Sequence, residues 1–320
     1  MPDAADLKTR NSVRSLTIRD LDQVVELDQA ASGQSRHAFF ENRLKTGQAE
    51  PRAFISLGLV HDGALQGHVL AQILDGEFGG SHPVAVLDAI AINALARGQG
   101  GARALLAHLE DMAKFLGVRE LRTQVQWADR QIVNFLAAVG FKLGERLVLE
   151  RSSARTDGEV AVGEHQLDDT QDYSANGTPL RAMSRDDLRA VAAIDRRLTG
   201  RDRSVYYARK IADSLREQGV RLSMLAEADD TTAGFVMARV DYGEFGQTSR
   251  EAVMDTLAVD PDLVGRGIGR AMMRQLLASL EALRVERIRT EARWDEFALL
   301  AFLGRLGFTP AQRVSLSKAL

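Results

Sequence analysis

The sequence predicts an α+β, or mixed α/β, fold made of two tandem domains, and three observations support this. First, the 320-residue chain repeats itself at a constant offset of 167 residues: Gly76–Gly79 recurs as Gly243–Gly246, and Trp127 recurs as Trp294. Second, each copy contains runs of alternating apolar residues that end at turn signals, as antiparallel strands do. Third, other runs place their apolar residues on one helical face. The chain is therefore a tandem duplication.

The repeat sets the expected domain bounds. We expect a first domain over 12–151 and a second over 178–320, each within the usual domain size. The stretch 152–177 is rich in Gly, Ser, Asp and Glu and poor in large apolar residues. This composition predicts a linker.

The elements of the first domain begin with a strand and two helical stretches. Val13–Ile18 alternates as a strand, and Asp20 is expected to cap a helix that continues through Leu27. A loop rich in Gly and Ser then leads to a second helical stretch around Phe39 and Leu44.

Three strands follow, over 53–61, 66–74 and 84–92. Asp62-Gly63 and Gly76–Gly80 are the signals of antiparallel hairpin turns between them.

After the third of these strands, a glycine-rich turn opens a helix over 102–116, which is followed by a strand over 121–125. A short helix over 132–139 ends at Gly140, a residue type that favours the left-handed conformation at helix ends. A last strand over 146–150 closes the unit, and the second unit is expected to repeat every element.

Composition excludes several classes of function. A net charge of −3 gives no support to a nucleic-acid partner. The absence of cysteine excludes disulfides, thiolate catalysis and Cys-ligated metals, and the six histidines show no metal-ligand spacing. No apolar run approaches the ~20 residues of a membrane span, and the N-terminus lacks a secretory signal pattern. We expect a cytoplasmic protein that uses no metal, nucleic acid or membrane.

The glycine turn at Gly265, Gly267 and Gly269 suits a phosphate, because amides at a helix start are unpaired and lie at the positive end of the helix dipole. A Walker A loop would need Gly-Lys-Ser/Thr, which neither copy has. A dinucleotide fingerprint would need G-x-G-x-x-G after the first strand of a βαβ unit, and the spacing here differs.

The first copy of the turn, Arg97-Gly98-Gln99-Gly100-Gly101-Ala102, resembles the acyl-CoA-binding motif Arg/Gln-x-x-Gly-x-Gly/Ala of the GNAT N-acetyltransferase superfamily. The second copy keeps Gly267 and Gly269 but has Val264 in the leading position. The resemblance covers both units. It implies two acyl-CoA N-acyltransferase-like domains, each a mixed, mostly antiparallel sheet flanked by helices, whose central strands splay apart around acetyl-CoA.

By this resemblance, acetyl-CoA is the co-substrate, and each unit binds it through the end of one strand and the turn that follows. The expected contacts in the first unit are Ile90, Ile92, Arg97, Gly98, Gln99, Gly100, Gly101, Ala102 and Arg103. Those in the second unit are Leu257, Val259, Val264, Gly265, Arg266, Gly267, Ile268, Gly269 and Arg270.

The family takes its general base from the strand before the glycine turn, where Asp88 and Asp255 lie. A carboxylate in a half-apolar strand is expected to have a raised pKa, which suits a base; a structural hydrogen-bond acceptor is the alternative. Glu77 and Glu244, in the repeated Gly-Glu-Phe-Gly turn, either meet an amine substrate or stabilise the turn.

The family's usual acid for the thiolate is a tyrosine four residues before the repeated Gly-Phe pair. Leu136 and Leu303 stand there, so neither unit offers an obvious acid.

Four further residues are candidates for substrate binding. Arg36 and Arg203 share a repeat position in the loop after the first helix, where an arginine can hold a carboxylate or phosphate; a solvated arginine is the alternative. Trp127 and Trp294 correspond to each other and either pack at a strand end or line the acceptor site.

Together these features predict an acetyl-CoA-dependent N-acetyltransferase that acetylates a primary amine by direct transfer, since no Cys or Ser-His pair could carry an acyl group. The acceptor is a small-molecule or protein amine, the protein is a monomer or homodimer, and polar groups favour the C-terminal unit as catalytic. A catalytically degenerate CoA-binding sensor or interaction protein is the alternative. A nucleotide-binding oxidoreductase is a third hypothesis.

Overall fold

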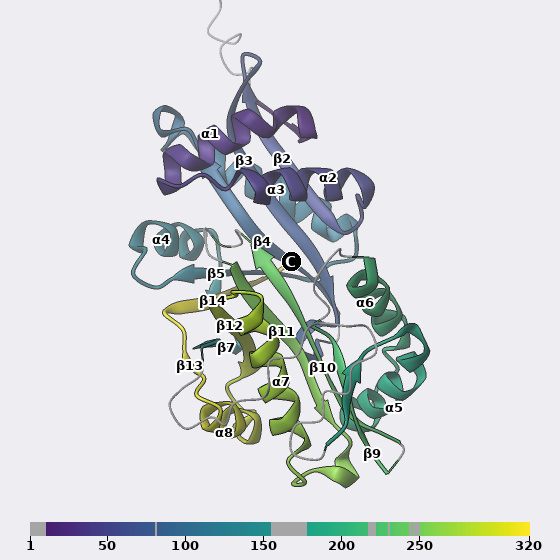
Figure 1. Ribbon diagram of the computed structural model, residues 1–320. Coiled ribbons are helices and arrows are strands. Elements are labelled where there is room, and N and C mark those ends of the chain that lie inside the picture. The colour runs from purple at the N-terminus through teal and green to yellow at the C-terminus, as the bar shows by residue number, and fades with distance from the viewer. Residues whose placement is uncertain are drawn as a thin grey trace, which may run out of the picture.

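The computed structural model describes residues 11–80, 82–154, 178–216, 222–229, 231–242, 245 and 250–320. Over these residues the chain forms two seven-stranded mixed sheets, each flanked by helices (Figure 1). The α+β fold and the tandem arrangement predicted from the sequence are therefore confirmed. Within the described part of the chain, no helix is both long and apolar enough to span a bilayer.

The first unit follows the predicted order of elements. Its helices and strands are β1 (Asn11–Ser15), α1 (Leu21–Ser32), α2 (His37–Ala49), β2 (Phe54–His61), β3 (Ala64–Asp75), β4 (Pro83–Ile92), α3 (Gly101–Phe115), β5 (Glu120–Gln126), α4 (Arg130–Ala138), β6 (Lys142–Leu143) and β7 (Arg146–Ser152). Short 3₁₀ turns occur at η2 (Ile18–Asp20), η3 (Glu77–Gly79) and η4 (Ala94–Ala96).

The second unit repeats this order. Its elements are β8 (Leu180–Ala182), η5 (Arg185–Asp187), α5 (Leu188–Thr199), α6 (Ser204–Arg216), β9 (Met224–Ala228), β10 (Thr231–Tyr242), β11 (Arg250–Val259), η7 (Pro261–Leu263), α7 (Ile268–Ala282), β12 (Arg287–Arg293), α8 (Phe297–Arg305), β13 (Thr309–Pro310) and β14 (Arg313–Ala319).

Two turn predictions hold, and one cap differs. Asp62 and Gly63 both have positive φ, as the predicted two-residue hairpin turn requires, and Gly140 has φ 96° at the end of α4. Asp20 does occupy the N-cap position before α1, but its carboxylate makes no cap bond to that helix. It accepts instead from the Thr17 amide and from the Arg14 guanidinium, because a 3₁₀ turn precedes the helix.

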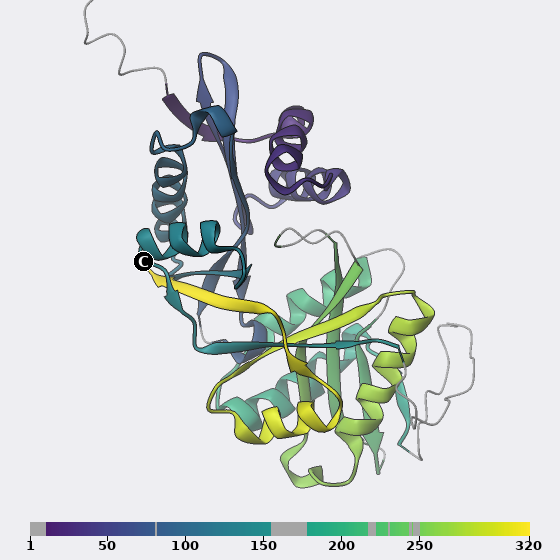
Figure 2. The ribbon, with the colours of Figure 1, turned by 90° about the vertical axis from the view of Figure 1, so that its left-hand side faces the viewer.

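The two units exchange their last strands. The sheet orders are β1-β2-β3-β4-β5-β14-β6 and β13-β7-β12-β11-β10-β9-β8, so β7 pairs with β12 and β14 pairs with β5. Figure 2 shows the yellow C-terminal strand running into the sheet of the first unit, where the Leu320 amide donates to the carbonyl of Arg119 just before β5. The units 12–151 and 178–320 follow the sequence repeat, whereas each sheet takes one strand from the other unit.

Helices cover both faces of each sheet. In the first unit α3 and α4 pack on one face and α1 and α2 on the other, which divides the core into two clusters (Figure 2). In the second unit α7 and α8 cover one face, and α5 and α6 the other. The exchanged strands contribute to the new cores, since Leu316 packs in the first unit and Leu149 in the second.

The central parallel strands of each sheet separate after a short pairing. β4 pairs with β5 only at Ala85↔Leu121 and Val86↔Arg122, although β4 stays paired with β3 as far as Ile92. In the second unit β11 pairs with β12 over three positions that end at Val253↔Arg289. Each sheet is thus open beyond this point, as the predicted splaying of the central strands requires.

Candidate active site

Asp88 and Asp255 each lie at a β-bulge at the start of the split. In the β3–β4 ladder Leu70 pairs with Ala89 and Ala71 with Leu87, so Asp88 is the extra residue. The β10–β11 ladder skips Asp255 in the same way. A bulge bends its strand and redirects a side chain, and such irregularities are frequent beside active sites.

A threonine hydroxyl holds each split strand at the bulge. Thr123 Oγ1 donates to the carbonyl of Leu87 at 2.9 Å, and Thr290 Oγ1 donates to the carbonyl of Met254 at 2.7 Å. Both acceptors come directly before an aspartate, and both threonines are buried. The hydroxyls therefore satisfy carbonyls at the point where the parallel ladder ends.

Asp255 lies at the centre of a buried charge cluster. Its side chain is inaccessible to solvent and contacts Lys210 Nζ closely, Arg239 Nη1 at 3.4 Å and Thr256 Oγ1 at 2.9 Å. Burial raises the pKa of Asp255, Lys210 and Arg239 oppose this effect, and the negative charge of Glu77 adds to it. The direction matches the sequence prediction of a raised carboxyl pKa.

Lys210 is the principal partner of Asp255. Burial lowers the pKa of its ammonium, but the negative charges of Asp255 and Glu77 outweigh this effect, so the net shift is upward. Lys210 is therefore a cation that neutralises the aspartate.

The first unit has a similar ion pair. Arg43 Nε lies 3.1 Å from Asp88 Oδ2, and Arg43 occupies the repeat position of Lys210. The sequence argument missed both cations. A basic residue at the same repeat position on two amphipathic helices is the signal that could have found them.

Glu77 belongs to this cluster although it comes from the first unit, so it crosses the boundary between the two units, here called the seam. Both of its carboxylate oxygens lie 3.1 Å from Arg239 Nη1, and Oε1 lies 3.5 Å from Lys210 Nζ. The neighbouring Gly76 carbonyl accepts from Arg203 at 2.7 Å. Glu77 belongs to the first unit in sequence but faces the aspartate of the second. Its repeat mate Glu244 lies outside the described residues.

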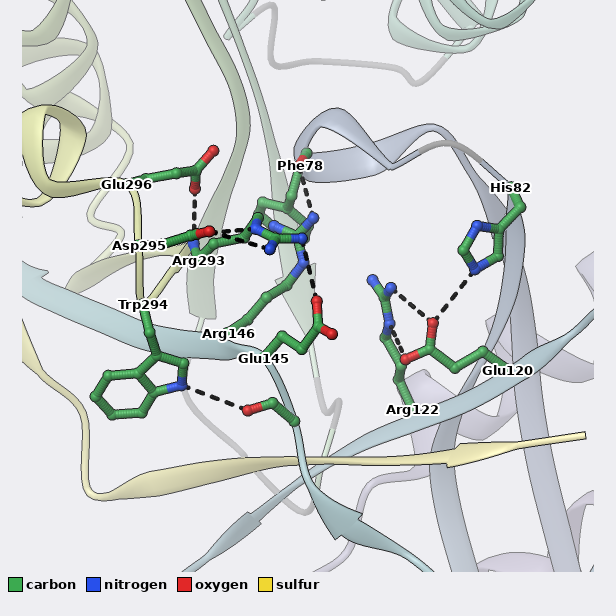
Figure 3. Close-up of polar contacts among 11 residues, drawn as sticks. Phe78, His82, Glu120, Arg122, Glu145, Arg146, Arg293, Trp294, Asp295 and Glu296 are labelled. Atoms are coloured by element: carbon green, nitrogen blue, oxygen red, sulfur yellow. Dashed lines mark hydrogen bonds and ion pairs between the residues drawn. The ribbon is translucent and has the colours of Figure 1, made fainter.

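Arg146 holds the turn that carries Glu77. Arg146 Nη2 donates to the carbonyl of Phe78 at 2.8 Å, and nearby Arg122 binds the Glu120 carboxylate through two N–H groups (Figure 3). His82 also lies 3.4 Å from Glu120 (Figure 3). Arg146 thus holds the carbonyl of the residue next to Glu77.

A cavity lies between the two sheets. It is lined from the first unit by Gln72, Glu77, Asp88, Arg122 and Gln124, among others, and from the second by Arg239, Arg289 and Glu291. Gln124 Nε2 donates to Glu291 Oε1 at 2.6 Å, so two residues that share one repeat position meet across the seam. The cavity carries charges of both signs, and Asp88 forms part of its wall.

The glycine turns have the conformation that the motif requires. Gly98, Gly100, Gly265 and Gly267 all have positive φ, and a Cβ at any of them would meet no atom within 4 Å. Backbone conformation rather than packing therefore demands glycine there. α3 begins at Gly101 and α7 at Ile268, so the unpaired amides of both helix starts lie beside the open strands. The arrangement suits the pyrophosphate of an acyl-CoA.

The predicted acyl-CoA contacts differ in accessibility. The turn residues Arg97, Gln99, Val264 and Arg266 are exposed, Val264 with 67% of its surface accessible. Ile268 is only 3% accessible and packs in the core. It can therefore offer only its backbone. All the predicted acyl-CoA contacts stay predictions.

Arg36 and Arg203 hold buried carboxylates. Arg36 Nε donates to Asp28 at 2.9 Å, and Arg203 lies 3.5 Å from Asp195 while it also binds the Gly76 carbonyl. Both arginines stack on aromatic rings of the following helix. Each therefore braces the loop between the first two helices of its unit.

The two tryptophans lie at strand ends, with Trp127 66% and Trp294 50% accessible. Trp294 Nε1 donates to the Gly144 carbonyl (Figure 3). Neither lines the cavity between the sheets. A role in substrate binding remains a prediction.

Leu136 and Leu303 are buried. Near the Asp255 cluster, burial and the charges of Asp255 and Glu77 raise the pKa of the Tyr206 phenol, which therefore stays protonated. Among the described residues, no group of three or more His, Asp or Glu side chains is arranged to hold a metal ion.

Comparison with known proteins gives matches in both units. The model of the acetyltransferase (GNAT) family matches residues 20–141 and 188–308. A [ribosomal protein bS18]-alanine N-acetyltransferase from Salmonella typhimurium is 35% identical over 95 residues, which are 29% of this chain and 60% of that protein. The chain thus spans less than two thirds of the length of this relative.

Two solved structures match over almost the whole chain. A GCN5-related N-acetyltransferase from Sphaerobacter thermophilus has a TM-score of 0.62 and 16% identity, with 97% of this chain and 96% of that chain covered. A tandem GNAT protein from the clavulanic acid biosynthesis pathway has a TM-score of 0.63 and 18% identity, with 97% and 98% covered. These likenesses concern the fold.

Proposed function

Because the chain belongs to the acetyltransferase (GNAT) family, we propose that it is an acetyl-CoA-dependent N-acetyltransferase that transfers the acetyl group directly to a primary amine. One observation carries the proposal: each unit holds a buried aspartate at a β-bulge where its central strands separate. That position brings a proton acceptor next to the opening in which the thioester would lie.

Acetyl-CoA would lie along each open strand pair, with its pyrophosphate on the amides of the glycine turn. The positive φ angles at Gly100 and Gly267 and the exposed turn surface support this placement. Val264 replaces a polar side chain in the second turn, but the backbone amides there are retained. We therefore expect acyl-CoA to bind both units.

In the proposed reaction the neutral amine nitrogen attacks the thioester carbonyl carbon. The carbon–sulfur bond breaks, coenzyme A leaves as the thiolate, and the aspartate carboxylate takes the proton that the amine loses. A positioned base of this kind contributes about 10²- to 10⁴-fold to the rate. The raised pKa of Asp255 favours proton uptake in the second unit.

The acceptor is a primary amine of a small molecule or a protein. The Salmonella relative is named for an alanine of a ribosomal protein, which favours a peptide amine as one candidate. The cavity between the units has carboxylates and arginines in its wall, which favours a polar group of the acceptor there.

The test is to incubate the protein with acetyl-CoA and a panel of amines that includes peptides starting with alanine, amino acids and polyamines. Thiol release and the product mass are both measured. We expect at least one amine to stimulate thiol release and to gain one acetyl group. Acetyl-CoA binding with no product from any amine would count against catalysis and favour a binding protein.

The same assay distinguishes the two units. Asp88→Asn and Asp255→Asn each keep the shape of the side chain and remove its negative charge. The variant that loses turnover identifies the working unit, and equal partial losses indicate two working units.

A further inference from the structure

The turn η3 of the first unit is fitted closely against the second. Gly76 has φ 91°, and a Cβ there would lie 3.0 Å from the ring of Tyr206 on α6. Arg203, also from the second unit, binds the Gly76 carbonyl. The positive φ and this close approach to α6 both favour glycine at position 76.

Glu77 is fixed on both sides within this turn. The next residue, Phe78, has a positive φ of 50°, and its carbonyl accepts from Arg146 (Figure 3). The carboxylate of Glu77 contacts Arg239 and Lys210, and its side chain is only 12% accessible. Glu77 is therefore a largely buried member of the cluster and not a surface charge.

The cluster consists of the carboxylates of Asp255 and Glu77 and the cations of Lys210 and Arg239. Asp255 is faced by Lys210 and Tyr206 from α6, by Arg239 from β10 and by Glu77 from η3. Arg239 and Lys210 each contact both Asp255 and Glu77. The two cations are therefore shared between the carboxylate of the second unit and that of the first.

We propose that Glu77 is a positioning residue of the second unit's site: it draws Lys210 and Arg239 partly away from Asp255 and so preserves the ability of that carboxylate to accept a proton. This inference rests on the proposed acetyl transfer. It makes the second site a composite, since its aspartate depends on a turn supplied by the first unit. An acceptor amine in the second unit would meet groups from both.

The physical reason is electrostatic. Without the charge of Glu77, both cations would serve Asp255 alone and stabilise its ionised form more strongly. The proton affinity of Asp255 would fall, and a weaker base gives a slower proton-transfer step.

The experiment compares Glu77→Gln with Asp75→Asn, both in an Asp88→Asn background that leaves only the second site. Asp75 is an exposed carboxylate of β3 just before the same turn, which makes it a matched control. The pH profile of acetyl transfer and the titration of Asp255, followed by carboxyl ¹³C NMR, are measured for both variants. We expect Glu77→Gln to lower the apparent pKa of Asp255 and of the acidic limb by about one unit, a typical effect of a nearby charge. Asp75→Asn should leave both unchanged.

A second variant tests the opposite direction. Arg239→Gln copies Gln72, the residue at this repeat position in the first unit, and removes one cation from Asp255. Arg239→Gln should raise the apparent pKa of Asp255 and that of the acidic limb of the pH profile. It also tests the proposal if Glu77→Gln does not fold.

The outcomes separate the two proposals. Unchanged Asp255 titration in both Glu77→Gln and Arg239→Gln, with normal acetyl transfer in the control, overturns the role of Glu77. If the original protein binds acetyl-CoA but acetylates no amine, the result counts instead against the proposed function. If the original protein is active and the control is not, the second site does not carry the reaction, and the role of Glu77 in it is overturned as well.

Discussion

Asp88 and Asp255 owe their positions to one extra residue in each strand. Alternation places every second side chain of a strand on one face, and the bulge shifts this pattern at the aspartate. The carboxylates are therefore buried beside cations of α2 and α6 rather than in solvent. A small backbone irregularity thus sets the site chemistry.

Thr290, which lies on β12 opposite the bulge of β11, should contribute to the stability of the fold. Thr290→Val removes the hydroxyl that donates to the Met254 carbonyl and leaves a buried acceptor without its donor. We expect a loss of about 1–3 kcal/mol in the free energy of unfolding. Urea denaturation checks this, with Thr290→Ser as the control that keeps the hydroxyl. Equal stability of the two variants would contradict the role assigned to the bond.

His68 should make the stability depend on pH. Burial lowers the pKa of His68 to about 4, and among the described residues neither ring nitrogen has a hydrogen-bond partner. In the unfolded chain His68 becomes protonated as the pH falls below about 6.5, whereas in the folded chain it becomes protonated only near pH 4. Stability should therefore decline across this window, by on the order of 3 kcal/mol in total.

His68→Phe tests this directly, because the second unit has Phe235 at the same repeat position. Denaturation at several pH values should show a smaller loss of stability between pH 6.5 and 4 in the variant. Parallel curves for the variant and the original protein would refute the prediction.

At the scale of elements, each glycine turn forms a continuous structural feature with the split strand that precedes it. The turn follows directly from the open strand and starts the helix, so its amides point to the region that the strands leave unfilled. The fit to a phosphate depends on the backbone conformation of the turn and on the unpaired amides at the helix start.

Gly267→Asp should weaken the binding of acetyl-CoA to the second unit without unfolding it. Asp tolerates positive φ better than most residues, and space is open around this position. The added carboxylate would repel the pyrophosphate, so we expect acetyl-CoA affinity of this unit to fall at least about tenfold, or 1.4 kcal/mol. Isothermal titration calorimetry measures it.

Gly267→Asn is the matched control, since it has nearly the same shape and no charge. It should retain most of the affinity that Gly267→Asp loses. If both variants bind acetyl-CoA as the original protein does, the turn is not the pyrophosphate site.

The elements could be predicted from sequence because their signals are local. Apolar alternation, the Asp62-Gly63 turn and the glycine at position 140 each act over a few residues. The bulges could not be predicted, because β4 is apolar at nearly every position, so a one-residue shift in its alternation leaves no clear break in the sequence. The contacts of Glu77 with Arg239 and Lys210 were missed because they join residues from different units.

The exchange of strands was missed for a related reason. β7 and β14 occupy the same repeat position, and either one presents an apolar face that suits either sheet. Sequence periodicity specifies which face of a strand is buried but does not specify its neighbour.

For the whole molecule, the exchange ties the two units together. β14 is paired between β5 and β6 of the first sheet, and β7 between β12 and β13 of the second. Neither sheet is complete without the other unit, so we expect both to unfold in one cooperative transition. Differential scanning calorimetry should give equal calorimetric and van't Hoff enthalpies. Two separate transitions would show that the units are independent.

The central claim is that a bulge aspartate beside the split strands accepts the proton during acetyl transfer. The most direct measurement is the rate of acetyl transfer by the double variant Asp88→Asn/Asp255→Asn, at saturating acetyl-CoA, beside the original protein. We predict a fall of about 10²- to 10⁴-fold with acetyl-CoA affinity largely retained. A double variant that keeps the original rate would contradict the claim.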